Sequence, residues 1–149
     1  MRSAMSLSRR TVLSFALACL PGLAAAQSVF TADGAAIRGY DPVAYFTEGR
    51  PVQGDPGMAL QWGGARWQFA TEANRALFEG NPAAYAPQFG GYCAWAVSRG
   101  YTAPIDPEAW KVVDGKLYLN YSKGVQRQWE ADVPGNIAKA EANWPRLGG

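Results

Sequence analysis

The sequence of 149 residues contains no histidine. This absence excludes serine–histidine–aspartate and cysteine–histidine catalysis, because in both the histidine is the base that activates the nucleophile. It also excludes histidine-ligated metals and the side chain that most readily exchanges protons near neutral pH. Cysteine is scarce as well, since the chain has two, Cys19 and Cys93. A single chain therefore cannot build a metal site from several thiolates.

A surplus of charge is also lacking. Residues 1–26 hold three arginines and no acid, and the other 123 residues carry 11 basic and 12 acidic side chains, a net charge of −1. A nucleic-acid interface needs a basic surface, so nucleic acid is not expected as a partner. A chain of this size supports one hydrophobic core, and we expect one domain.

The first 26 residues have the pattern of a signal peptide. Arg9 and Arg10 precede an apolar run over 11–20, Pro21 and Gly22 break the run, and Ala24 to Ala26 supply the small residues of a cleavage site. The run is too short to cross a membrane, so we expect cleavage after Ala26 and a soluble periplasmic protein without a stable membrane span.

The export route and the fate of the cysteines follow from the same segment. Residues 8–13 resemble a twin-arginine export signal, with a general secretory leader as the alternative. Cleavage would discard Cys19. Cys93 would then remain alone in an oxidising compartment and could not form a disulfide within the chain.

The remaining sequence predicts an α+β domain over 39–145, preceded by a flexible segment over 27–38 and followed by a tail over 146–149. Two β-hairpins are expected to form an antiparallel sheet that packs against several short helices. The first hairpin should point Trp62 and Trp67 inward, because apolar residues alternate on both sides of its turn. Asp114-Gly115 is typical of a tight turn in the second hairpin, over 110–121.

Helices are predicted where capping residues precede apolar periodicity. Asp41-Pro42 and Asp106-Pro107 each combine a cap with proline at the first helical position. Leu77 and Phe78 should face the core. The expected helices are a short one over 43–46, then 72–79 capped by Thr71, 82–85, 89–97, 122–129 and about 136–143.

Two segments share the order hairpin, Ser or Thr cap, and helix with an aromatic residue seven positions after the cap. Thr71 pairs in this way with Phe78, and Ser122 with Trp129. A duplication and common supersecondary structure both explain this order.

Several motifs together resemble an exported bacterial YHS-domain protein, over residues 38–145. The resemblance is to the branch in which the position of Cys93 can be cysteine or selenocysteine. The motifs are Gly39-Tyr40-Asp41-Pro42-Val43-Ala44-Tyr45-Phe46, Trp67-Gln68-Phe69-Ala70, Phe78 with Asn81-Pro82 and Tyr85-Ala86-Pro87, Gly90-Gly91-Tyr92-Cys93, and Val113-Asp114-Gly115-Lys116-Leu117-Tyr118-Leu119-Asn120-Tyr121.

The resemblance does not carry a metal site to this chain. Short YHS modules associated with heavy metals have cysteines at the positions that correspond here to Ala44, Ala70 and Asn74. No metal-ligating residue is therefore predicted. A bound soft metal would need Cys93 of two chains or an external ligand.

Cys93 has two readings. It follows a glycine pair at an expected helix start, where backbone amides would favour the thiolate needed for nucleophilic or redox chemistry. Cysteine on an apolar stripe is, however, often plain core. The cysteine or selenocysteine alternation that the resemblance implies favours the reactive reading, with Cys93 as the catalytic residue.

A ligand pocket is predicted beside Cys93, formed by Gly90, Gly91, Tyr92, Trp95 and Tyr101. For Asp41, Asp106 and Asp114, a capping or turn role is the better explanation than acid–base chemistry.

The leading functional hypothesis is a periplasmic YHS-domain protein whose Cys93 is a thiol redox or ligand-binding centre. A periplasmic thiol reductant or a small ligand would be its partner, because the chain has no resolving cysteine. One alternative is a non-catalytic module that binds a small ligand or a protein, with Cys93 in the core. Another is a metal-binding or chaperone protein that uses Cys93 across a dimer. Cofactor, turnover and oligomeric state stay open.

Overall fold

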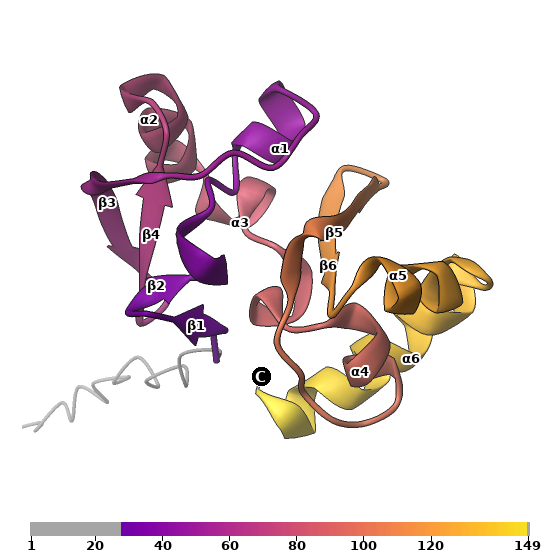
Figure 1. The fold of residues 1–149 in the computed structure, drawn as a ribbon. Coiled ribbons are helices and arrows are strands. Elements are labelled where there is room, and N and C mark those ends of the chain that lie inside the picture. The colour runs from indigo at the N-terminus through magenta and orange to yellow at the C-terminus, as the bar shows by residue number, and fades with distance from the viewer. Residues whose placement is uncertain (1–27, 149) are drawn as a thin grey trace, which may run out of the picture.

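The computed structural model describes residues 28–148 (Figure 1). This part of the chain is a small α+β domain with three antiparallel two-stranded sheets and six α-helices. The predicted fold class is confirmed. Each hairpin forms a sheet of its own, and the strands of different hairpins do not pair. The predicted signal peptide, residues 1–26, lies outside the described residues.

The ordered domain begins before residue 39. Strands β1 (Thr31–Ala32) and β2 (Ala35–Ala36) pair with each other, and a 3-10 turn, η1 (Ile37–Gly39), follows. The sequence predicted a flexible segment here, but Phe30, Ala36 and Ile37 are buried in the core. Polar composition misled the prediction, because these few apolar side chains suffice to anchor the segment.

Helix α1 (Ala44–Thr47) lies close to the predicted range, but its cap residue is Val43, so Pro42 precedes the helix and does not occupy the predicted first helical position. The first long hairpin then pairs β3 (Asp55–Trp62) with β4 (Ala65–Phe69). Thr71 caps α2 (Glu72–Gly80) by accepting a hydrogen bond from the Asn74 amide, and α3 (Pro82–Tyr85) follows directly. Both helices were predicted within one residue.

Two inward-facing predictions in this region are wrong. Trp62 is 37% exposed, because it stands at the turn end of β3, where the core of the sheet ends. Leu77 is 44% exposed. The buried face of α2 is set by Asn74 and Phe78, four residues apart, which turns Leu77 away by about a quarter of a turn.

The predicted helix over 89–97 is broken. A 3-10 segment, η2 (Gln88–Gly91), and a five-residue helix, α4 (Ala94–Ser98), occupy this stretch. Within η2, Phe89, Gly90 and Gly91 have φ of 57°, 63° and 82°. Left-handed backbone at three successive residues cannot continue a right-handed helix.

The second long hairpin pairs β5 (Asp106–Val113) with β6 (Lys116–Asn120) around the predicted turn, where Asp114 and Gly115 have φ of 51° and 74°. Asp106-Pro107 begins this strand rather than a helix, so that prediction is wrong. The Asp106 carboxylate instead accepts the Glu108 amide at 2.9 Å, which makes a local turn.

The chain ends with two helices. Helix α5 (Lys123–Glu130) is capped by Ser122, as predicted. Helix α6 (Val133–Leu147) starts earlier and ends later than predicted. Asp132 caps it, and Pro134 and Gly135 occupy its first turn instead of separating two elements, because proline is well tolerated there.

Two aromatic-rich cores hold these elements together. In Figure 1, β3, β4 and α2 lie at one side of the molecule, β5, β6, α5 and α6 at the other, and α3 lies between them. The first core includes Trp67, Phe69 and Phe78, and the second is centred on Tyr118, Trp129 and Trp144. Within residues 28–148, no helix has the length and apolar character needed to cross a membrane.

Candidate functional site: a buried thiol and an aromatic groove

Cys93 is the residue immediately before α4, and 1% of it is exposed. Its sulfur sits between two groups from the end of β6. The Cys93 thiol donates to the Asn120 Oδ1 across 3.6 Å, and the Tyr121 backbone amide donates to the sulfur at 3.3 Å. The Asn120 side chain is itself fully buried and also accepts the Trp95 amide at 3.0 Å. Its Nδ2 has no hydrogen-bond partner among the described residues.

Burial raises the pKa of the Cys93 thiol above its ordinary value. Backbone amides of Ala96, Tyr121 and Trp95 act in the opposite direction but do not overcome desolvation. The expectation that a helix start would favour the thiolate is therefore wrong in direction. Helix α4 has five residues, too few to offset the loss of water around the sulfur.

The predicted pocket beside Cys93 does not form as one cluster. Gly91 is buried and packs toward Ile37, where a Cβ would lie 2.7 Å from a methyl carbon. Tyr101 is 52% exposed. Trp95 is half-buried, with the Arg99 guanidinium 4.0 Å from its ring centre.

Tyr92 and Gly90 are placed closer to a real cavity. Tyr92 packs against Phe30 and Trp144, with ring centres 5.7 and 6.1 Å away, and its hydroxyl lies 3.1 Å from the Ser28 hydroxyl. Of the five predicted ligand residues, Gly90 alone lines the cavity described next.

A groove of about 490 Å³ lies where four distant segments of the chain meet. These segments are the start of the described chain, the β3–β4 turn, the stretch from α3 through η2, and the end of α6. We call this cavity the aromatic groove. It is lined by Val29, Trp62, Gly63, Trp67, Ala83, Ala86, Pro87, Gln88, Phe89, Gly90, Glu141, Trp144 and Pro145.

Gly90 allows these segments to meet. A Cβ at this residue would collide with the Ser28 carbonyl oxygen, and its φ of +63° is one that glycine adopts readily. The Phe30 amide donates to the Gly90 carbonyl at 2.9 Å, so the chain crosses η2 in direct contact and Val29 lies at the groove.

Aromatic contacts fix the walls of the aromatic groove. Trp62 packs edge-on against Phe78, with ring centres 5.6 Å apart, while its own carbonyl accepts the Trp67 indole at 3.0 Å. On the opposite wall, Trp144 and Phe89 have ring centres 6.1 Å apart. Neighbouring aromatic rings hold each wall residue, so the groove is largely preformed.

Sequence reasoning missed the aromatic groove. The alternating pattern of the first hairpin predicts Trp62 in the core, and the sequence predicts no role for Trp144. A signal for Trp62 was present, because a tryptophan directly before Gly63-Gly64 stands at the end of a strand. No sequence signal shows that α6 returns to this turn.

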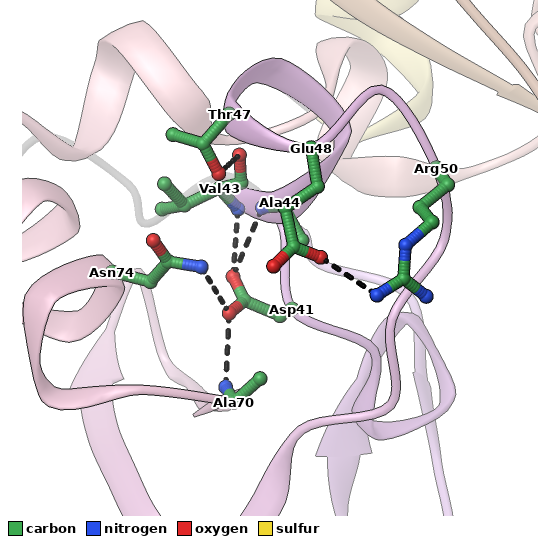
Figure 2. A network of polar contacts seen from close by, with 8 residues as sticks. All are labelled: Asp41, Val43, Ala44, Thr47, Glu48, Arg50, Ala70 and Asn74. Atoms are coloured by element: carbon green, nitrogen blue, oxygen red, sulfur yellow. Dashed lines mark hydrogen bonds and ion pairs between the residues drawn. The ribbon is translucent and has the colours of Figure 1, made fainter.

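Asp41 forms the most connected buried polar site in the described chain (Figure 2). Its Oδ1 accepts the Val43 amide at 2.8 Å and the Ala44 amide at 3.3 Å. Its Oδ2 accepts the Ala70 amide at 2.9 Å and the Asn74 Nδ2 at 2.8 Å. Four donors from three segments occupy the carboxylate, which agrees with the structural role predicted for Asp41.

Within residues 28–148, no group of three or more Cys, Asp or Glu side chains is arranged to hold a metal ion. Comparison of the chain with known protein-family models, curated proteins and solved structures finds no match. The resemblance to YHS-domain proteins therefore stays a prediction.

Proposed function

We propose that this protein is an exported, YHS-like binding module, and that the aromatic groove holds a small apolar ligand while Cys93 belongs to the core. The observation that carries the proposal is the aromatic groove itself. Its volume of about 490 Å³ is typical of a small-molecule site, and Trp62, Trp67, Phe89 and Trp144 line it.

The environment of Cys93 favours this module over a thiol redox centre. A reactive cysteine needs a stabilised thiolate and access for its substrate. Cys93 is 1% exposed, and burial raises the pKa of its thiol. Two hydrogen-bond partners hold the sulfur in place. Cys93 is also absent from the lining of the aromatic groove.

A fluorescence titration with N-phenyl-1-naphthylamine, a neutral aromatic probe, tests the proposal. We expect saturable binding to the full chain, and about a tenfold loss of affinity in Trp62→Ala because a wall of apolar contact is removed. A second variant, Ala83→Trp, fills the groove from the exposed face of α3 without removing any core side chain.

Two matched variants complete the experiment. Tyr101→Ala removes an exposed aromatic residue outside the groove and should leave the affinity unchanged. Cys93→Ala should also leave it unchanged. Absence of saturable binding to the unmodified chain would overturn the proposed function. So would an unchanged affinity in the folded Trp62→Ala and Ala83→Trp variants.

A further inference from the structure

The charged side chain at the aromatic groove is negative. Among the described residues that line it, Glu141 is the charged one, and Gln88 supplies the other polar side chain. Glu141 is exposed and stands one helical turn before Trp144 on α6, so its carboxylate and the Trp144 ring lie on neighbouring positions of one helix face.

Neither cation of α6 faces Glu141. Lys139 lies two residues before Glu141, a spacing that puts the two side chains on different faces of the helix, and it does not line the groove. Arg146 donates to the Asn143 side chain at 3.1 Å, and its guanidinium reaches toward Gly100, where an added Cβ would meet it at 2.8 Å. It does not line the groove. The Glu141 charge is therefore not neutralised by this arginine.

Aromatic rings add to the same preference. The face of an indole or phenyl ring is electron-rich and attracts a cation, most strongly when the cation is partly desolvated. Trp62 is the most accessible ring of the groove, at 37% exposed, and the buried Trp67, Phe89 and Trp144 contribute the edges that reach its wall. An anion would be repelled by the Glu141 carboxylate and by the electron-rich ring faces. A cation bearing methyl groups is attracted by both and needs no hydrogen-bond acceptor.

We infer that the ligand of the aromatic groove is a small organic cation, an alkylammonium or quaternary ammonium group attached to an apolar or aromatic body. The inference rests on the proposed function, because it names the chemical class that the proposed ligand site selects. The apolar body lies against the tryptophans, and the ammonium group faces Glu141.

The test compares two probes of nearly equal shape, benzyltrimethylammonium and its neutral carbon isostere neopentylbenzene. Affinities are measured on the full chain by quenching of tryptophan fluorescence at low ionic strength. We expect the cation to bind about 3- to 30-fold more tightly than the neutral isostere. The preference should shrink when salt is added, because Glu141 is exposed.

Glu141→Gln should reduce the preference for the cation while the affinity for neopentylbenzene stays the same. The matched control is Glu79→Gln, an exposed carboxylate on α2 outside the groove, which should change neither affinity. Trp62→Ala should weaken binding of both probes.

The outcomes separate the two proposals. Equal affinity for the two probes, or a cation preference that is undiminished in Glu141→Gln, overturns the cationic class. If neopentylbenzene still binds and Trp62→Ala still weakens it, the apolar binding site stands. Failure of both probes to bind counts against the proposed function itself.

Discussion

The β3–β4–α2 and β5–β6–α5 units have the same layout. Each has an eight-residue strand that starts with Asp-Pro, a two-residue turn, a five-residue strand, and a Ser or Thr cap before a helix. Both hairpins shift register after the first pair. Equivalent residues differ by a constant 51 positions, as in Asp55 and Asp106, Thr71 and Ser122, and Phe78 and Trp129.

The similarity extends to how each unit binds the short helix beside it. In the first unit, the amide after the second strand, that of Ala70, donates to Asp41, which also accepts the Val43 amide. In the second unit, the amide of Tyr121 donates to the Cys93 sulfur. The amide of Trp95, two residues after Cys93, is accepted by Asn120.

Beside the first unit, the Asp41 carboxylate accepts both the amide at the hairpin end and an amide of the short helix region. Beside the second unit, these two contacts are divided between the Cys93 sulfur and the Asn120 side chain. Asp41 and Cys93 each precede a short helix, α1 or α4, and join it to the end of a hairpin (Figure 2 shows the Asp41 site). Cys93 therefore has an architectural task, independent of any chemistry at its sulfur. Sulfur accepts hydrogen bonds weakly, so the second junction should be the less stable one.

The largest expected effect is at the stronger junction. Asp41→Asn replaces one carboxylate oxygen by an NH2 group, which donates and cannot accept, so two of the four donors around Asp41 lose their acceptor. We expect the free energy of unfolding to fall by about 3 kcal/mol, measured by urea denaturation, because buried donors are left unpaired. Asp55→Asn, an exposed carboxylate that accepts one local amide, is the control and should cost less than about 1 kcal/mol. A smaller loss for Asp41→Asn than for Asp55→Asn would contradict the comparison.

Asn120→Ala should rank second. It leaves the Trp95 amide and the Cys93 thiol without an acceptor but also removes the unpaired Nδ2, so we expect a loss of about 2 kcal/mol. Alkylation of Cys93 by iodoacetamide should speed up in this variant, because α4 is held less firmly. An unchanged alkylation rate together with full stability would show that Asn120 does not join α4 to β6.

Cys93→Ala should cost least of the three, about 1 kcal/mol, since it deletes one buried atom and a weak acceptor. Ligand binding in the aromatic groove should be retained. If the folded variant loses its ligand, Cys93 has a role that the structural comparison with Asp41 does not explain.

A pH titration of stability tests the burial of the Cys93 thiol. Because burial raises the pKa of Cys93 above about 9.0, its contribution to stability is complete below that pH and declines as the pH rises above it. Between pH 8 and pH 9.5 we expect the wild type to lose less than about 1 kcal/mol relative to Cys93→Ala, measured by urea denaturation. The pKa values of Tyr45 and Tyr118 are raised from 10.0, so the ionisation of these two tyrosines affects stability at higher pH than that of Cys93. Stability that rises with pH relative to Cys93→Ala would contradict the burial of a neutral thiol.

Local signals explain the parts of the fold that the sequence predicted. Thr71 and Ser122 cap helices by a contact with the amide three residues ahead, and Asp114-Gly115 adopts the backbone of a tight turn by itself. These features depend on neighbours within a few positions, so they can be recognised without knowing the rest of the fold.

Tertiary contacts explain what was missed. The break at Phe89 depends on the Ser28–Phe30 segment, which crosses Gly90 and is about 60 residues distant in sequence. The aromatic groove needs Trp62 and Trp144 to meet across 82 positions. The sequence around Cys93 indicates a helix start but does not show how deeply α4 is buried. That burial raises the pKa of the Cys93 thiol.

The two extremities of the described chain lie next to each other, because the Ser28 amide donates to the Gly148 carbonyl at 2.8 Å. A short peptide linker could therefore close the backbone into a ring, and new termini could be opened at the exposed Asp114-Gly115 turn with little change in the packed core. Such a circular permutant would move both ends, and any affinity tag attached to them, away from the aromatic groove.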